Sequence, residues 1–149
     1  MMGLANPHFE ESYARIFGDG IGMDESADDF FRAFYQRFLS QPTIADLFEH
    51  TDHDRQVRML KKSVYQLVTY YVARESNAEL DRLAAAHHSM GIAANAFDIW
   101  LEALLATVEE FDPQWDQTTR LAWCWALSPG MTYMSLKPSI DFEQSPTVE

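Results

Sequence analysis

The sequence predicts an all-α protein of about six to seven helices. Apolar residues recur at helical spacing along most of the 149-residue chain, and no segment alternates apolar and polar residues as half-buried strands do. The six glycines and six prolines stand at intervals that separate the helical segments. This length is typical of one domain, which we expect over residues 1–137, with a flexible acidic tail over residues 138–149.

Turn-forming residues bound the first two helices. The first is expected over Pro7–Phe17, because the turn Gly18–Gly20 follows it. The second begins near Ser26 and ends before Pro42, where a short turn leads to the next helix. Its apolar positions are mostly aromatic and include Phe30, Phe31, Phe34, Tyr35, Phe38 and Leu39.

The third long helix is amphipathic. It begins at Asp52 or Asp54, either of which can cap it, and extends to about Arg74. One stripe at helical spacing consists of Gln56, Leu60, Val64, Leu67 and Tyr71. The opposite arc carries the basic side chains Arg55, Arg58, Lys61 and Lys62. A solvated face is the simplest role for this arc, and recognition of a carboxylate at its margin stays open.

The remaining helices are expected after position 77. One runs over Ala78–Met90 and ends at Gly91, a suitable C-terminal cap. Asn95 can cap the next helix, which has a strongly apolar stripe. The last helix is expected to open at Asp112-Pro113, and Ser128–Gly130 should kink or interrupt it.

Charge and cysteine content limit the classes of function and location. The 23 acidic and 11 basic side chains give a formal net charge of -12, which disfavours binding to nucleic acids and anionic membranes. No stretch is apolar enough to span a membrane. The N-terminus lacks the pattern of a secretory signal, and the single cysteine cannot form an internal disulfide, so we expect a cytoplasmic protein.

Among the five histidines, His87 has the most informative position. It falls on the same helical face as Leu80, Leu83 and Ala84, whereas His88 is turned toward the edge of that face. A neutral imidazole at this place can bind iron through one ring nitrogen while the other donates to a backbone carbonyl. A packed core histidine is the open alternative.

Two further candidates have simpler interpretations. His50 and His53, beside Asp52 and Asp54, could in principle hold a divalent metal, but no third or fourth ligand follows at a suitable spacing. A solvated helix start is therefore favoured. Cys124 lies among tryptophans and is interpreted as a small buried hydrophobe rather than a nucleophile.

Three ordered segments carry a resemblance to a known family. They are Phe34–Leu39 followed by Ala45–Phe48, then Thr51–Gln56, and then His87–Ile92 with Phe97 and Leu104-Leu105 beyond. In this order they resemble the globin family, specifically bacterial single-domain haemoglobins and the haem domains of flavohaemoglobins. The resemblance covers nearly the whole chain from about Ala27 to Met134. It implies a globin fold enclosing a haem pocket, with haem b and its iron as the cofactor.

On the proximal side, the resemblance makes His87 rather than His88 the iron ligand, with the register fixed by Gly91 and Ile92. Phe97 stands where flavohaemoglobins have a tyrosine that can help to polarise the proximal histidine. Phenylalanine cannot donate a hydrogen bond, which puts electron donation through His87 in doubt. This departure favours reversible ligand binding over oxidase chemistry.

On the distal side, the resemblance places Tyr35 and Gln56 as hydrogen-bond donors to a ligand on the iron. Leu60 shapes the pocket, and Phe48 matches the aromatic side chain that packs on the haem. Two donors over iron would stabilise the negative charge on dioxygen, which implies high affinity and slow release. His53, one turn before Gln56, is expected nearer the mouth of the pocket than the sixth coordination position.

The leading prediction is a haem-binding globin that reversibly binds dioxygen, and also carbon monoxide and nitric oxide, as a monomer or homodimer. One alternative is a nitric oxide dioxygenase or peroxidase-like enzyme, which would need an external reductase because 149 residues leave no space for flavin and nicotinamide domains. Another is a gas-sensing interaction module with a diffusible partner. A haem-free helical bundle, with His87 in its core, is the fourth.

Overall fold

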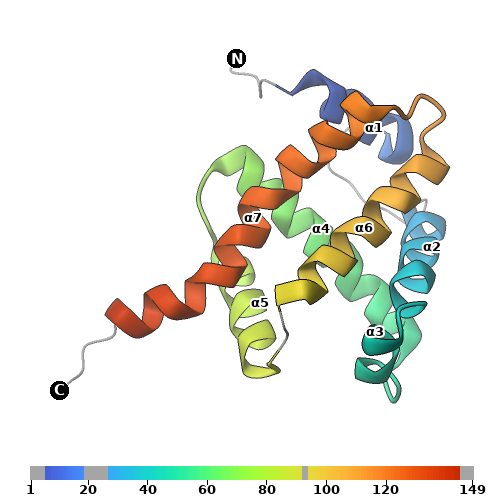
Figure 1. Ribbon diagram of the computed structural model, residues 1–149. Helices are drawn as coiled ribbons and strands as arrows, with labels where there is room; N and C mark the ends of the chain where they lie inside the picture. Colours follow the sequence, from blue (N-terminus) through green and yellow to red (C-terminus); the bar gives the residue numbers. More distant parts are fainter. Residues whose placement is uncertain (1–5, 19–26, 92–93, 145–149) are drawn as a thin grey trace.

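The computed structural model describes residues 6–18, 27–91 and 94–144, and these residues form α-helices joined by short connections (Figure 1). In chain order the helices are α1 (Pro7–Phe17), α2 (Asp28–Leu39), α3 (Pro42–Leu47), α4 (His53–Ala73), α5 (Ala78–Ser89), α6 (Ala94–Phe111) and α7 (Gln117–Gln144). No strand occurs in the described ranges, so the all-α prediction is confirmed. None of these helices is long and apolar enough to cross a membrane.

Side-chain caps fix the starts of the two helices that frame the candidate site. Asp52 precedes α4, and its Oδ1 accepts hydrogen bonds from the backbone N–H groups of Asp54 at 3.0 Å and Arg55 at 3.4 Å. Asn77 caps α5 in the same way, because its Oδ1 accepts from the N–H of Leu80 at 2.8 Å. The expected cap at Asp52 is therefore present. It satisfies backbone N–H groups in the first turn of α4, which have no partner within the helix.

Two expectations about the later helix starts are wrong. Asn95 does not cap α6, because the helix already includes Ala94. Asp112 and Pro113 do not open α7 but lie in the turn before it, and the cap is Asp116, whose Oδ1 accepts from the N–H of Thr119 at 2.8 Å. Asp112 is buried instead, where its carboxylate ties this turn to α1.

The helix α7 is continuous through Ser128–Gly130, which contradicts the expected interruption there. At this point α7 approaches α4 closely, since a Cβ added at Gly130 would lie 2.6 Å from Cδ2 of Leu67. Burial of this contact stabilises the helix across Pro129, whose ring removes one backbone donor. The helix also extends over residues 138–144, within the segment expected as a flexible tail, and residues 145–149 lie outside the described part.

A buried polar network joins α1 to the turn between α6 and α7. The Asp112 carboxylate accepts from Arg15 Nε at 2.7 Å, from Arg15 Nη2 at 2.9 Å and from Ser12 Oγ at 2.6 Å. Trp123 Nε1 donates in turn to Ser12 Oγ at 2.8 Å. Burial alone would raise the pKa of Asp112, but the hydrogen bonds from Arg15 and Ser12 outweigh it and hold the pKa below its usual value.

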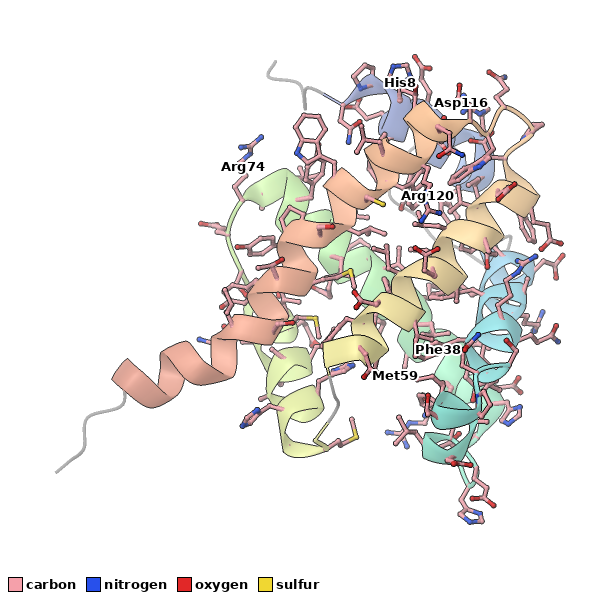
Figure 2. All side chains as sticks on the ribbon, in the orientation of Figure 1. His8, Phe38, Met59, Arg74, Asp116 and Arg120 are labelled. Carbon is pink, nitrogen blue, oxygen red and sulfur yellow. The ribbon has the colours of Figure 1, made fainter. Side chains whose placement is uncertain are left out.

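The helices pack around an aromatic core. In this arrangement α4 packs against α7 and α2, α5 packs against α7, and α2 packs against α6. Fully buried side chains in the core include Phe31, Phe34, Val64, Leu104 and Trp123. Figure 1 shows α3, the start of α4 and the end of α5 at the same lower end of the molecule. In Figure 2, Arg120 lies between α7 and α6, where its Nη2 is 2.7 Å from Oε2 of Glu102.

Candidate functional site

The side chain of His87 is half-buried near the end of α5, and its neighbour His88 is exposed. The Nδ1 atom of His87 lies 2.8 Å from the backbone carbonyl oxygen of Leu83, one turn earlier. A carbonyl oxygen can only accept, so Nδ1 carries a proton, and in the neutral ring Nε2 then has the lone pair. This is the tautomer in which a histidine can bind a metal through Nε2.

Phe97, near the start of α6, stacks on the imidazole of His87. The two ring centroids are 5.9 Å apart, and the planes are inclined by 28°. This contact brings together the two residues expected on the proximal side. A phenyl ring holds the imidazole by packing but offers it no hydrogen bond, so only the Leu83 carbonyl polarises His87 among the described groups.

On α2, Tyr35 is buried, with 3% of its surface exposed. Its hydroxyl has no hydrogen-bond partner among the described residues. An unpaired buried hydroxyl costs about 1–3 kcal/mol, so such a group calls for a partner outside the protein chain, such as a water molecule or a bound ligand. The phenol of Tyr35 is therefore a donor available to a ligand.

Two aromatic rings enclose Tyr35. Phe48 meets it edge-on with ring centroids 6.0 Å apart, and His53 does so at 5.3 Å. Tyr35 and Phe48 were both expected on the distal side, and here they are in contact; the contact with His53 was not expected. The spacing of His53, Val57, Leu60 and Val64 at four, three and four residues could have revealed it, because it places His53, which is itself exposed, on the same face one turn before the buried stripe of α4.

The two other expected pocket residues on α4 differ in position. Leu60 is buried, with 8% of its surface exposed, on the face of α4 that is directed to the core. Gln56 is half-buried at the edge of that face, because the buried position next to it is Val57. The Gln56 amide forms no hydrogen bond within the described ranges, so none joins it to Tyr35.

A groove lies away from these residues, along α7 and beside Tyr70 of α4. It has a volume of about 740 Å³ and is lined mainly by apolar side chains, among them Leu121, Trp125 and Leu136. Cys124 also lines it and is half-buried, packed against the core, so it is less enclosed than the buried hydrophobe that the sequence suggested. Within the described residues, no group of three or more histidine, cysteine or acidic side chains could hold a metal, which leaves His50 and His53 without a metal site.

The chain is similar to known proteins both in sequence and in structure. Residues 32–129 match the family model for globins. A similar crystal structure is that of a protein from Pseudomonas aeruginosa PAO1, described as structurally highly homologous to a human haemoglobin. The two chains are 30% identical with a TM-score of 0.72, over 88% of this chain and 95% of that one. No curated protein sequence matches.

Proposed function

Because this chain belongs to the globin family of haem-binding proteins, we propose that it binds haem b through His87 and that it holds dioxygen, carbon monoxide or nitric oxide reversibly. When bound, haem would supply an iron atom that can hold a small gas, and His87 is the side chain that would hold this iron. The chain supplies the ligand, the orientation of that ligand, and the polar and apolar groups around the gas.

The hydrogen bond from His87 Nδ1 to the Leu83 carbonyl supports His87 as the axial ligand. It fixes the tautomer and the ring angle before haem binds, which lowers the entropic cost of ligation. Stacking by Phe97 restrains the same ring from the side of α6. His88 lacks both contacts and is exposed, so it cannot be held in this way.

The observation that carries the proposal is the unpaired buried hydroxyl of Tyr35. A diatomic gas that gains negative charge needs a donor in a dry pocket, and the phenol O–H is such a donor. Phe48 and Leu60 contribute apolar surface on the same side, which keeps water away from this hydrogen bond. Gln56 is a second donor of suitable chemistry at the edge of this face.

Phe97 favours reversible binding over turnover. A histidine ligand that also donates to a carboxylate or phenol gives more electron density to iron, and among the described residues neither group hydrogen-bonds to His87. Nitric oxide dioxygenation or peroxidase-like turnover, each with an external reductase, is therefore the second candidate.

The test is the visible spectrum of the haem-reconstituted protein in its ferrous and ferrous carbon monoxide forms. We expect the spectra of a histidine-ligated haem for the wild type and for His88→Ala. His87→Gly should lose them, and added imidazole should restore them. A protein that does not take up haem, or an unchanged spectrum in His87→Gly, would contradict the proposal.

A further inference from the structure

The basic side chains of this acidic protein are distributed unevenly. Helix α4 contains four basic residues and a single acidic one, Asp54, whereas the whole chain has a net charge of -12. Elsewhere, most arginines pair with carboxylates, as in Arg15–Asp112, Arg32–Asp29, Arg37–Glu110, Arg82–Glu79 and Arg120–Glu102. The positive charge that is not neutralised in this way is concentrated on α4.

Three of these cations share the outer face of α4. Arg55, Arg58 and Lys62 are exposed and follow one another at three and four residues, which aligns them along the helix. Arg55 and Arg58 form no salt bridge with any residue in the described ranges. Lys61 is turned aside, and its Nζ lies 2.8 Å from Oδ1 of Asp28.

Two large apolar side chains are exposed along the same face. Met59 is 38% exposed and Tyr65 is 39% exposed. Arginine, methionine and tyrosine are enriched in protein interfaces, whereas an ordinary solvated helix face carries lysine and glutamate. We call the set Arg55, Arg58, Met59, Lys62 and Tyr65 the basic stripe.

The basic stripe lies on the reverse of the face that borders the candidate haem site. Leu60 and Val64 are buried on the inner face of α4, and His53 at its start contacts Tyr35. A helix with its side chains is about 10 Å across. A partner docked on the stripe would therefore be separated from the pocket by the thickness of one helix.

We propose that the basic stripe is the docking surface for an acidic electron-donor protein, an inference that rests on the proposed function. In the docked complex, one electron passes from the reduced cofactor of the donor to ferric haem iron. The donor is oxidised by one electron, the iron becomes ferrous, and no bond is made or broken. This step restores the state that binds dioxygen.

Charge complementarity selects this partner and its orientation. The acidic remainder of the surface repels an acidic protein, so attraction is confined to the stripe, where Arg55 and Arg58 present guanidinium groups to carboxylates. Once the charged groups are paired, the exposed ring of Tyr65 and the exposed thioether of Met59 supply apolar contact. The net charge of -12 opposes nucleic acids and anionic lipids over the rest of the molecule.

The experiment uses the ferric holoprotein under carbon monoxide in a stopped-flow instrument, with reduced flavodoxin as the acidic donor. The stripe variant is Arg55→Glu with Arg58→Glu. The matched control is Arg32→Glu with Arg82→Glu, which changes the net charge equally on α2 and α5. Dithionite is a small reductant that needs no docking, so its rate of haem reduction shows whether the haem site itself is unchanged in each protein.

We expect the flavodoxin rate to fall about tenfold in the stripe variant and to lose most of its dependence on salt. In the control it should change by less than about twofold, and dithionite should reduce all three proteins alike. Equal flavodoxin rates in the stripe variant and the control would overturn the proposal, and so would stripe-dependent sedimentation with anionic phosphatidylglycerol vesicles. Failure to form a carbon monoxide complex with dithionite would instead contradict the proposed function.

Discussion

The replacement Tyr35→Phe separates the functional from the structural role of this phenol. The change removes one oxygen atom and keeps the ring that packs between Phe48 and His53. In the haem-free protein the hydroxyl is buried without a partner, at a cost of about 1–3 kcal/mol. Removing it should therefore raise the free energy of unfolding of the apoprotein, by about 1 kcal/mol.

The same replacement should weaken gas binding in the holoprotein. A hydrogen bond from Tyr35 to dioxygen contributes about 1.4 kcal/mol, which corresponds to about a tenfold faster dissociation rate once it is lost. Carbon monoxide carries less negative charge on its outer atom, so its dissociation should change less. Stopped-flow ligand replacement measures both rates, and urea unfolding of the apoprotein measures the stability.

Tyr13→Phe is the matched control. The hydroxyl of Tyr13 is also buried without a partner, and burial raises its pKa to about 12, so it stays neutral in any ordinary buffer. It belongs to an aromatic cluster with Phe9 and Trp123 on α1 and α7. This variant should gain similar stability with unchanged gas kinetics. An unchanged dioxygen dissociation rate in Tyr35→Phe would refute the assignment of its hydroxyl.

Three further predictions concern the scaffold. Asp112→Ala should lower the free energy of unfolding by about 3 kcal/mol in urea titrations, because it leaves Arg15 without its carboxylate, and a loss below 1 kcal/mol would contradict the network. Hydrogen bonds hold the pKa of Asp112 below its unfolded value, so this stabilisation is complete above about pH 4 and is lost as the pH falls through the folded-state pKa. The free energies of unfolding of the wild type and of Asp112→Ala, compared over this pH range, should show the loss. Gly130→Ala should destabilise the protein by about 1 kcal/mol, because displacing Leu67 costs more than the gain in helix propensity, and a higher melting temperature would disprove this.

Local sequence signals were sufficient for most of the fold. Asp52 as a cap, Gly91 with its φ of 68° and the stripe of α4 are decided within one or two helical turns. Asp112 failed as a prediction because its role depends on Arg15, which lies 97 residues earlier in the chain. The continuity of α7 through Pro129 likewise depends on packing against α4, which no local pattern contains.

In the candidate site, too, features within one helix could be predicted from the sequence, and contacts between helices could not. The direction of His87 follows from the face it shares with Leu80, and a hydrogen bond within one turn completes it. The pairing of Tyr35 with His53 joins α2 to α4 across α3 and its two connections, whose geometry the sequence does not specify. On α4, the expected stripe is buried at Leu60, Val64, Leu67 and Tyr71, but at its first turn Val57 is buried and Gln56 lies at the edge of the face.

The packing of α5 predicts which part of this helix haem binding should protect most from hydrogen exchange. Its first half is anchored, because Asn77 caps it, Leu80 is buried, and Asp81 Oδ1 accepts from Tyr133 on α7 at 2.7 Å. Its last turn is held more weakly, by the stacking of Phe97 on His87, and Met90 is 64% exposed. Ligation of haem by His87 would anchor this turn, so amide hydrogen exchange over residues 84–90 should slow more on reconstitution than exchange over residues 78–83. Equal protection of the two halves, or protection of neither, would mean that α5 does not carry the iron ligand.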